Sequence, residues 1–192
     1  MAVARIEVSA FSYAVNQNLS GMLKTNERLG QTIKSGLNHI KRVYLSSDLM
    51  RINYNDAYAI GLDEFDDRRR MITASYNDFN AELRLVTERV GSVSRLTQKA
   101  AQLVRQIGEL FEFEEGLMAE IEFPECAAHH LKHSHFLETL HDEFERIQSG
   151  HSDMYDLSYL VGGWLIEHMR SKDKAFGAFI VKAARDMAEA AD

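Results

Sequence analysis

Apolar residues recur at intervals of three and four along almost the whole chain of 192 residues, which contains a single proline. This spacing predicts α-helices that each bury one face. Ser, Gly and Asp residues interrupt it near positions 46–48, 91–92 and 149–150, and Pro124 suits the first turn of a helix. The predicted helices cover about residues 2–47, 65–90, 94–121, 124–148 and 153–188. The last four are long and closely linked, so the fold class is all-α, an antiparallel four-helix bundle with a long N-terminal helical extension.

The first predicted helix carries a stricter pattern than the others. Nine of its residues alternate at intervals of four and three: Val15, Leu19, Met22, Asn26, Leu29, Ile33, Gly36, Ile40 and Val43. Such a heptad seam pairs with another helix, so it predicts a homodimer joined through this helix. The alternative is a helix that folds back on its own bundle. We therefore divide the chain into an amphipathic or coiled-coil helix over residues 1–48 and a bundle domain over residues 49–192.

The composition of the chain argues against nucleic-acid and membrane partners. The chain has 29 acidic and 22 basic residues, a formal net charge of -7, and no sustained basic stripe, which argues against a nucleic-acid partner. No run of residues approaches the roughly 18 apolar residues of a membrane-spanning helix, and the N-terminus lacks the pattern of a secretory signal. A single cysteine leaves no internal disulfide and is typical of a reducing compartment. We therefore expect a cytoplasmic protein without a membrane span.

The candidate metal-binding residues are polar residues that fall on the apolar, buried faces of the predicted helices. His129 and His133 are one helical turn apart on an apolar face, and Glu114 and His168 fall on the apolar faces of two other helices. Asp173 follows His168 by five residues, about 140° around the helix, so it reaches the same site only from the flank. Three imidazoles with one or two carboxylates suit iron or zinc; the alternative is a metal-free polar core. Three further histidines lie off the buried faces and are expected to be solvated: His130, His135 and His141.

Residues 52–176 resemble hemerythrin and the bacterial hemerythrin-like domains. The resemblance rests on four segments in the family's order and spacing: Tyr58–Asp66, Phe111–Met118, Pro124–His133 and Trp164–Asp173. It implies a four-helix bundle around a di-iron centre that binds O2 reversibly, with five histidines, one glutamate and one aspartate as ligands. By this resemblance Glu114 and Asp173 would bridge the two irons, and the histidines of one iron would be His129, His133 and His168.

The chain departs from the family pattern at the ligands of the other iron. The family has a histidine in the first bundle helix where this chain has Arg69, and another four residues before the bridging glutamate, where it has Leu110. A guanidinium beside Glu114 and Asp173 would restore positive charge and donate several N–H groups, and Leu110 would fill the space of an imidazole. Spacing alone does not distinguish Arg69 from Arg68 as the inward residue, and the alternative is a solvated run of three arginines.

A single iron changes the expected function. Reversible O2 binding in the family takes one electron from each of two irons, which one iron beside Arg69 would not repeat. We expect a non-enzymatic regulatory or sensor protein with one iron per chain, or zinc in its place, that responds to O2 or another small diatomic ligand, to redox state or to metal. The signal would pass to a partner protein. Two alternatives are a di-iron protein that binds O2 or oxidises substrates, with another group replacing the lost histidines, and a metal-free bundle used for assembly.

Overall fold

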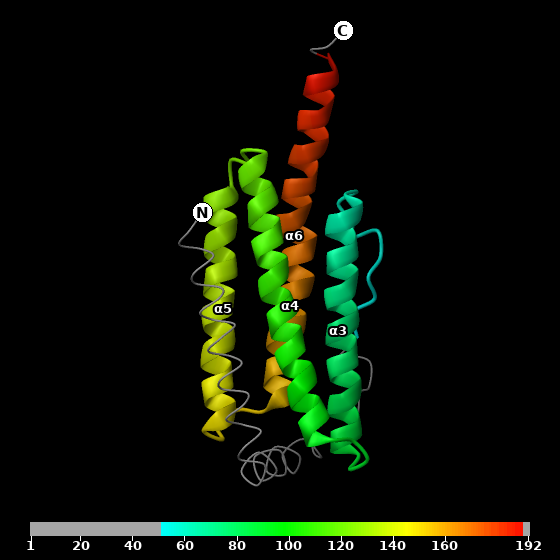
Figure 1. Ribbon diagram of the computed structural model, residues 1–192, viewed down its shortest axis with the longest axis vertical. Helices are drawn as coiled ribbons and strands as arrows, with labels where there is room; N and C mark the ends of the chain where they lie inside the picture. The colour runs from blue at the N-terminus through cyan, green and yellow to red at the C-terminus, as the bar shows by residue number, and fades with distance from the viewer. Residues whose placement is uncertain (1–50, 190–192) are drawn as a thin grey trace.

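The structure, a computed structural model, describes residues 51–189, and these form a bundle of four α-helices. The helices are α3 Asp63–Thr87, α4 Val93–Glu120, α5 Cys126–Gln148 and α6 Met154–Glu189. Consecutive helices run in opposite directions, and α6 extends beyond the others at its C-terminal end (Figure 1). The prediction of an all-α, antiparallel four-helix bundle is thus confirmed. Among residues 51–189, no helix is both long and apolar enough to cross a membrane. The predicted N-terminal helix, its heptad seam and the domain boundary after residue 48 lie outside the described residues.

The turn between α4 and α5 differs from the expectation at Pro124. Helix α5 begins at Cys126, so the proline lies in the preceding turn and not in the first turn of the helix. Glu122 takes a positive φ of 55° there, and the N–H of Phe123 donates to the carbonyl of Met118 at 2.9 Å, which closes the end of α4. The result is a tight reversal that brings the start of α5 beside the end of α4.

Two apolar clusters fill the bundle, and a polar layer lies where one gives way to the other. The larger cluster runs from the middle of the bundle to the α3–α4 turn and includes Phe79, Leu103, Leu140 and Leu157. The smaller cluster consists of Ile60, Phe65, Met118, Phe123 and Phe176. The buried polar residues between them come from all four helices: Arg69, Glu114, His129, His133, His168 and Asp173. Because neighbouring helices are antiparallel, residues far apart in the sequence meet at one depth.

Candidate metal centre

Three imidazoles converge in the polar layer. His129 and His133 lie one turn apart on α5, His168 faces them from α6, and each side chain is at most 3% exposed. The Nε2 atom of His168 lies 2.9 Å from that of His129 and 3.0 Å from that of His133. Phe111 stacks on His133 and Trp164 stacks on His168, with ring centroids 3.7 and 4.1 Å apart. The stacking fixes the rings of His133 and His168, and the Nε2 atoms of all three histidines point into one small volume.

Glu114 adds a carboxylate to this cluster from α4. Its side chain is fully buried, and within the described residues neither carboxylate oxygen has a hydrogen-bond partner. Its Oε2 atom lies 3.3 Å from Nε2 of His133 and 3.8 Å from Nε2 of His129. Burial would raise the pKa of Glu114, but the facing imidazoles of His129 and His133 hold that pKa well below its usual range. A buried carboxylate whose two oxygens accept no hydrogen bond is suited to a bound cation.

These donor atoms fit a metal ion. Glu114, His129, His133 and His168 each offer one ligand atom, and all of these atoms lie within 4.8 Å of one another. Nitrogens 2.9 and 3.0 Å apart match two ligands at right angles, each about 2.1 Å from one ion. A set that mixes imidazole nitrogen with carboxylate oxygen suits iron or zinc better than magnesium or calcium.

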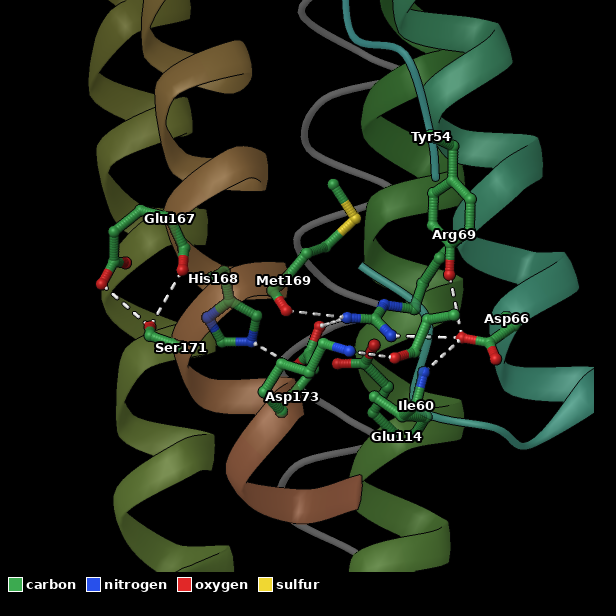
Figure 2. A network of polar contacts seen from close by, with 12 residues as sticks. Tyr54, Ile60, Asp66, Arg69, Glu114, Glu167, His168, Met169, Ser171 and Asp173 are labelled. Carbon is green, nitrogen blue, oxygen red and sulfur yellow. Dashed lines mark hydrogen bonds and ion pairs between the residues drawn. The ribbon is translucent and has the colours of Figure 1, made fainter. Parts of the chain in front are cut away.

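Asp173 joins the cluster from the flank and is shared with Arg69. Its Oδ1 atom lies 3.1 Å from Nε2 of His168 and, among residues 51–189, has no hydrogen-bond partner. Its Oδ2 atom accepts a hydrogen bond of 2.7 Å from Nη2 of Arg69. Figure 2 shows the guanidinium lying between α3 and α6 in this arrangement. One carboxylate oxygen therefore faces the imidazoles, and the other faces a fixed positive charge.

Arg69 is fully buried and links the centre to the segment that precedes α3. Its Nη2 atom also donates to the carbonyl of Met169 at 3.2 Å, and its Nη1 atom donates to Oδ1 of Asp66 at 3.4 Å. Three donors of the preceding segment hold Asp66: the hydroxyl of Tyr54 and the backbone N–H groups of Ile60 and Gly61, at 2.8, 3.0 and 2.9 Å. Burial opposes the charge of Asp66, but these donors and Arg69 keep its pKa below its usual value. The network is continuous from Tyr54 to Asp173 (Figure 2).

Comparison with known proteins agrees with this geometry. Over 124 residues the chain is 30% identical to a bacteriohemerythrin of Stenotrophomonas maltophilia (strain R551-3), an alignment that covers 64% of this chain and 77% of that protein. The chain belongs to the bacteriohemerythrin family. No family model matches the sequence, and no solved structure gives a significant match. Together with the buried cluster, the relationship identifies a hemerythrin-like metal-binding protein.

The bundle separates the arginines that spacing could not distinguish. Arg69 points inward, whereas the side chain of Arg68 is 41% exposed and pairs with Glu64 at 2.9 Å. The alternative of a solvated arginine run therefore does not describe Arg69. Leu110 is buried in the larger apolar cluster, one turn before Glu114 on α4. Both residues that we expected in place of hemerythrin histidines thus lie in the interior of this bacteriohemerythrin-family chain.

Sequence reasoning missed a polar pair beside the bacteriohemerythrin-like cluster. The carboxylate of Glu115 lies 2.8 Å from Nδ1 of His133 and 2.8 Å from Nδ1 of His130. His130 is therefore not the free, solvated histidine that we expected, although His135 is exposed as expected, at 84%. Burial would raise the pKa of Glu115, but the hydrogen bonds from His133 and His130 lower it overall. One feature of the sequence could have indicated this contact: Glu115 and His130 each directly follow a candidate ligand, Glu114 and His129.

Proposed function

We propose that this protein is a non-enzymatic regulatory or sensor protein that holds one metal ion per chain, with iron as the favoured metal. The ligands would be Glu114, His129, His133, His168 and Asp173. The observation that carries the proposal is Arg69, a fully buried guanidinium bonded to the oxygen of Asp173 that faces away from the imidazoles. In a hemerythrin-type centre this is the side on which a second ion would be held.

The buried charges favour one ion over two. Among the side chains of this layer that are at most 5% exposed, Asp66, Glu114 and Asp173 bring three negative charges, and Arg69 brings one positive charge. One divalent ion with neutral imidazole ligands balances the remaining two negative charges. A second divalent ion would leave two uncompensated positive charges in an interior that strongly disfavours them. Arg69 therefore acts as a permanent replacement for the second cation.

A single ion supports sensing better than reversible O2 storage. By the family resemblance, O2 storage takes one electron from each of two irons. Arg69 stands in the place of the second iron, and a guanidinium is not redox-active. A bound iron would supply a one-electron redox change or an open position for O2 or another small diatomic ligand. The residues of this chain would hold the ion and exclude water, with Phe111 and Trp164 covering two of the ligand imidazoles.

The polar network offers a route from the ion to a partner. Asp173 contacts Arg69, Arg69 contacts Asp66, and Asp66 is held by the segment that leads into α3. A change in the charge around Asp173 would alter the balance of these bonds. We expect the heptad helix predicted over residues 2–47 to join two copies of the chain and to pass the change to a partner protein.

Metal analysis of the full chain, purified without O2 and then exposed to air, tests the proposal. We expect about one iron or zinc per chain and no absorption bands of an oxo-bridged iron pair. Half-buried His141 and exposed Asp142 and Glu145 also offer three ligand atoms, so His141→Ala serves as a control that should leave the metal count unchanged. Two irons per chain with oxo-bridge bands would overturn the proposal in favour of the di-iron alternative, and a metal-free protein would refute the metal site.

A further inference from the structure

Glu115 bridges two histidines of α5 and lies just outside the cluster of candidate ligands. Its Oε1 atom lies 2.8 Å from Nδ1 of His133, and its Oε2 atom lies 2.8 Å from Nδ1 of His130. The side chain is 15% exposed, and that of His133 is 1% exposed. Each oxygen of one carboxylate thus serves one imidazole, and one of these imidazoles belongs to the metal cluster.

We propose that Glu115 is a positioning residue for the metal ion and that His130 in turn holds Glu115 in place. Glu115 fixes the tautomer and the orientation of His133, so that the Nε2 atom of His133 is presented to the ion. This role rests on the metal site proposed above and adds to it a residue that is not a ligand.

The chemistry of the contact determines the tautomer. A carboxylate only accepts hydrogen bonds, so the Nδ1 atom of His133 carries the proton and donates it to Glu115. When this ring binds an ion as a neutral imidazole, the free lone pair is therefore on Nε2, which lies 3.3 Å from Oε2 of Glu114 among the other candidate ligand atoms. A carboxylate in this position also makes the imidazole a stronger electron donor to the ion.

The ring of His133 is held in two independent ways. Phe111 lies parallel to it, with an interplanar angle of 1° and ring centroids 3.7 Å apart, which fixes the plane of the ring. Glu115 fixes which edge of the ring faces the ion. A 180° flip about χ2 would keep the stacking but put Cδ2 in the place of Nδ1 and Cε1 in the place of Nε2. The bond to Glu115 would then be lost, so the carboxylate is what selects between the two orientations.

His130 anchors the carboxylate from the other side. Its side chain is 34% exposed, and its Nε2 atom lies 3.4 Å from Oγ of Ser134. Because it follows His129 and lies one turn before Ser134 on α5, it points across to α4 without entering the cluster. Removing His130 would free one oxygen of Glu115 and allow the carboxylate to turn away from His133.

Titration of the full chain with Fe(II) in the absence of O2, against a competing chelator, measures the effect. Glu115→Ala should weaken iron binding by about 10- to 100-fold, the range typical of lost partners of metal-bound histidines. Glu115→Gln should lose less, because its amide oxygen still accepts from Nδ1 of His133. Both variants should raise the Fe(III)/Fe(II) reduction potential, since each removes a negative charge next to a ligand. The matched control is Glu112→Gln, an exposed glutamate on the same helix, which should change neither quantity.

A second pair of variants tests the anchor. His130→Ala should weaken Fe(II) binding by a smaller factor than Glu115→Ala and in the same direction, whereas His135→Ala, an exposed histidine of the same helix, should have no effect. The double variant of Glu115 and His130 should be no worse than Glu115→Ala, because His130 acts through the carboxylate. A double variant with additive losses would overturn the role of His130.

NMR of the unaltered chain loaded with Zn(II) keeps the proposal testable if a variant fails to fold. We expect a slowly exchanging imidazole proton on Nδ1 of His133, and the proposal is overturned if Nδ1 is unprotonated. Two failures remain distinguishable. Unaltered protein that binds no metal refutes the proposed metal site itself. Unaltered protein that binds iron no more tightly than a folded Glu115→Ala variant refutes only the positioning role.

Discussion

Arg69→Ala should strongly destabilise the metal-free bundle. The substitution removes the donor from Oδ2 of Asp173 and from the carbonyl of Met169, and it removes the nearest positive charge from Asp66. All of these groups lie in a layer closed by apolar clusters on both sides. Water cannot reach them easily to replace the lost guanidinium.

The expected loss follows from the burial of the pair. Arg69 is 0% exposed and Asp173 is 1% exposed in their side chains, so solvent does not screen their interaction. Removing one member of such a pair costs about 3–5 kcal/mol of unfolding free energy, because the other charge stays buried without a partner. For a chain of this length that loss corresponds to a drop in the unfolding midpoint of about 6–20 °C.

Thermal unfolding followed by circular dichroism, with and without added Fe(II), measures the drop. The metal-loaded variant should lose less stability than the metal-free variant, since a bound ion would compensate part of the charge of Asp173. Arg70→Ala is the matched control, because Arg70 and Asp67 form an ion pair whose side chains are 52% and 68% exposed, and its midpoint should stay close to that of the unaltered chain. A metal-free Arg69→Ala protein that melts with the unaltered chain would refute the idea that this guanidinium neutralises buried carboxylates.

Three further predictions concern metal binding and assembly. The single tryptophan of the chain, Trp164, stacks near the site, so iron should quench its fluorescence, and His133→Ala should abolish that quenching; quenching that persists would place the iron elsewhere. Arg69→His combined with Leu110→His should raise the metal content from about one to about two ions per chain and produce O2-dependent absorption bands, whereas neither single substitution should suffice; a double variant that still holds one ion contradicts the replacement model. Light scattering should find the full chain dimeric, and deletion of residues 1–47 should leave a folded, metal-binding monomer; a monomeric full chain would remove the support for signalling through a coiled coil.

The sequence alone was sufficient for the helices and for most of the cluster. Helical periodicity and the breaks between periodic segments are local properties, so the bounds of the four described helices lie within about three residues of the predicted ones. His129 and His133 are also a local feature, because residues four apart share one face of a helix. Pro124 is the exception, since the reversal between α4 and α5 uses two more residues than the first-turn preference of proline suggested.

Tertiary structure decided which arginine is buried and how Asp173 reaches the centre. Arg68 and Arg69 both border the apolar stripe of α3, and periodicity places a side chain around the helix only to within the width of that stripe. The carboxylate of Asp173 on α6 meets Arg69 and not Arg68. Asp173 lies about 140° from His168 around the helix, yet its Oδ1 atom is 3.1 Å from the Nε2 atom of His168. That approach depends on the side-chain orientations within the packed bundle.

The bridge from Glu115 to His130 and His133 depended entirely on how two helices pack. Both Glu115 and His130 lie about 100° around their helices from a candidate ligand, a position that in an isolated helix indicates a solvated surface. Only the packing of α4 beside α5 brings them within 2.8 Å of each other. Spacing within one helix determines which residues share a face, but the contact between two faces depends on the rotation of each helix about its own axis, and that rotation is set by the packing of the whole core.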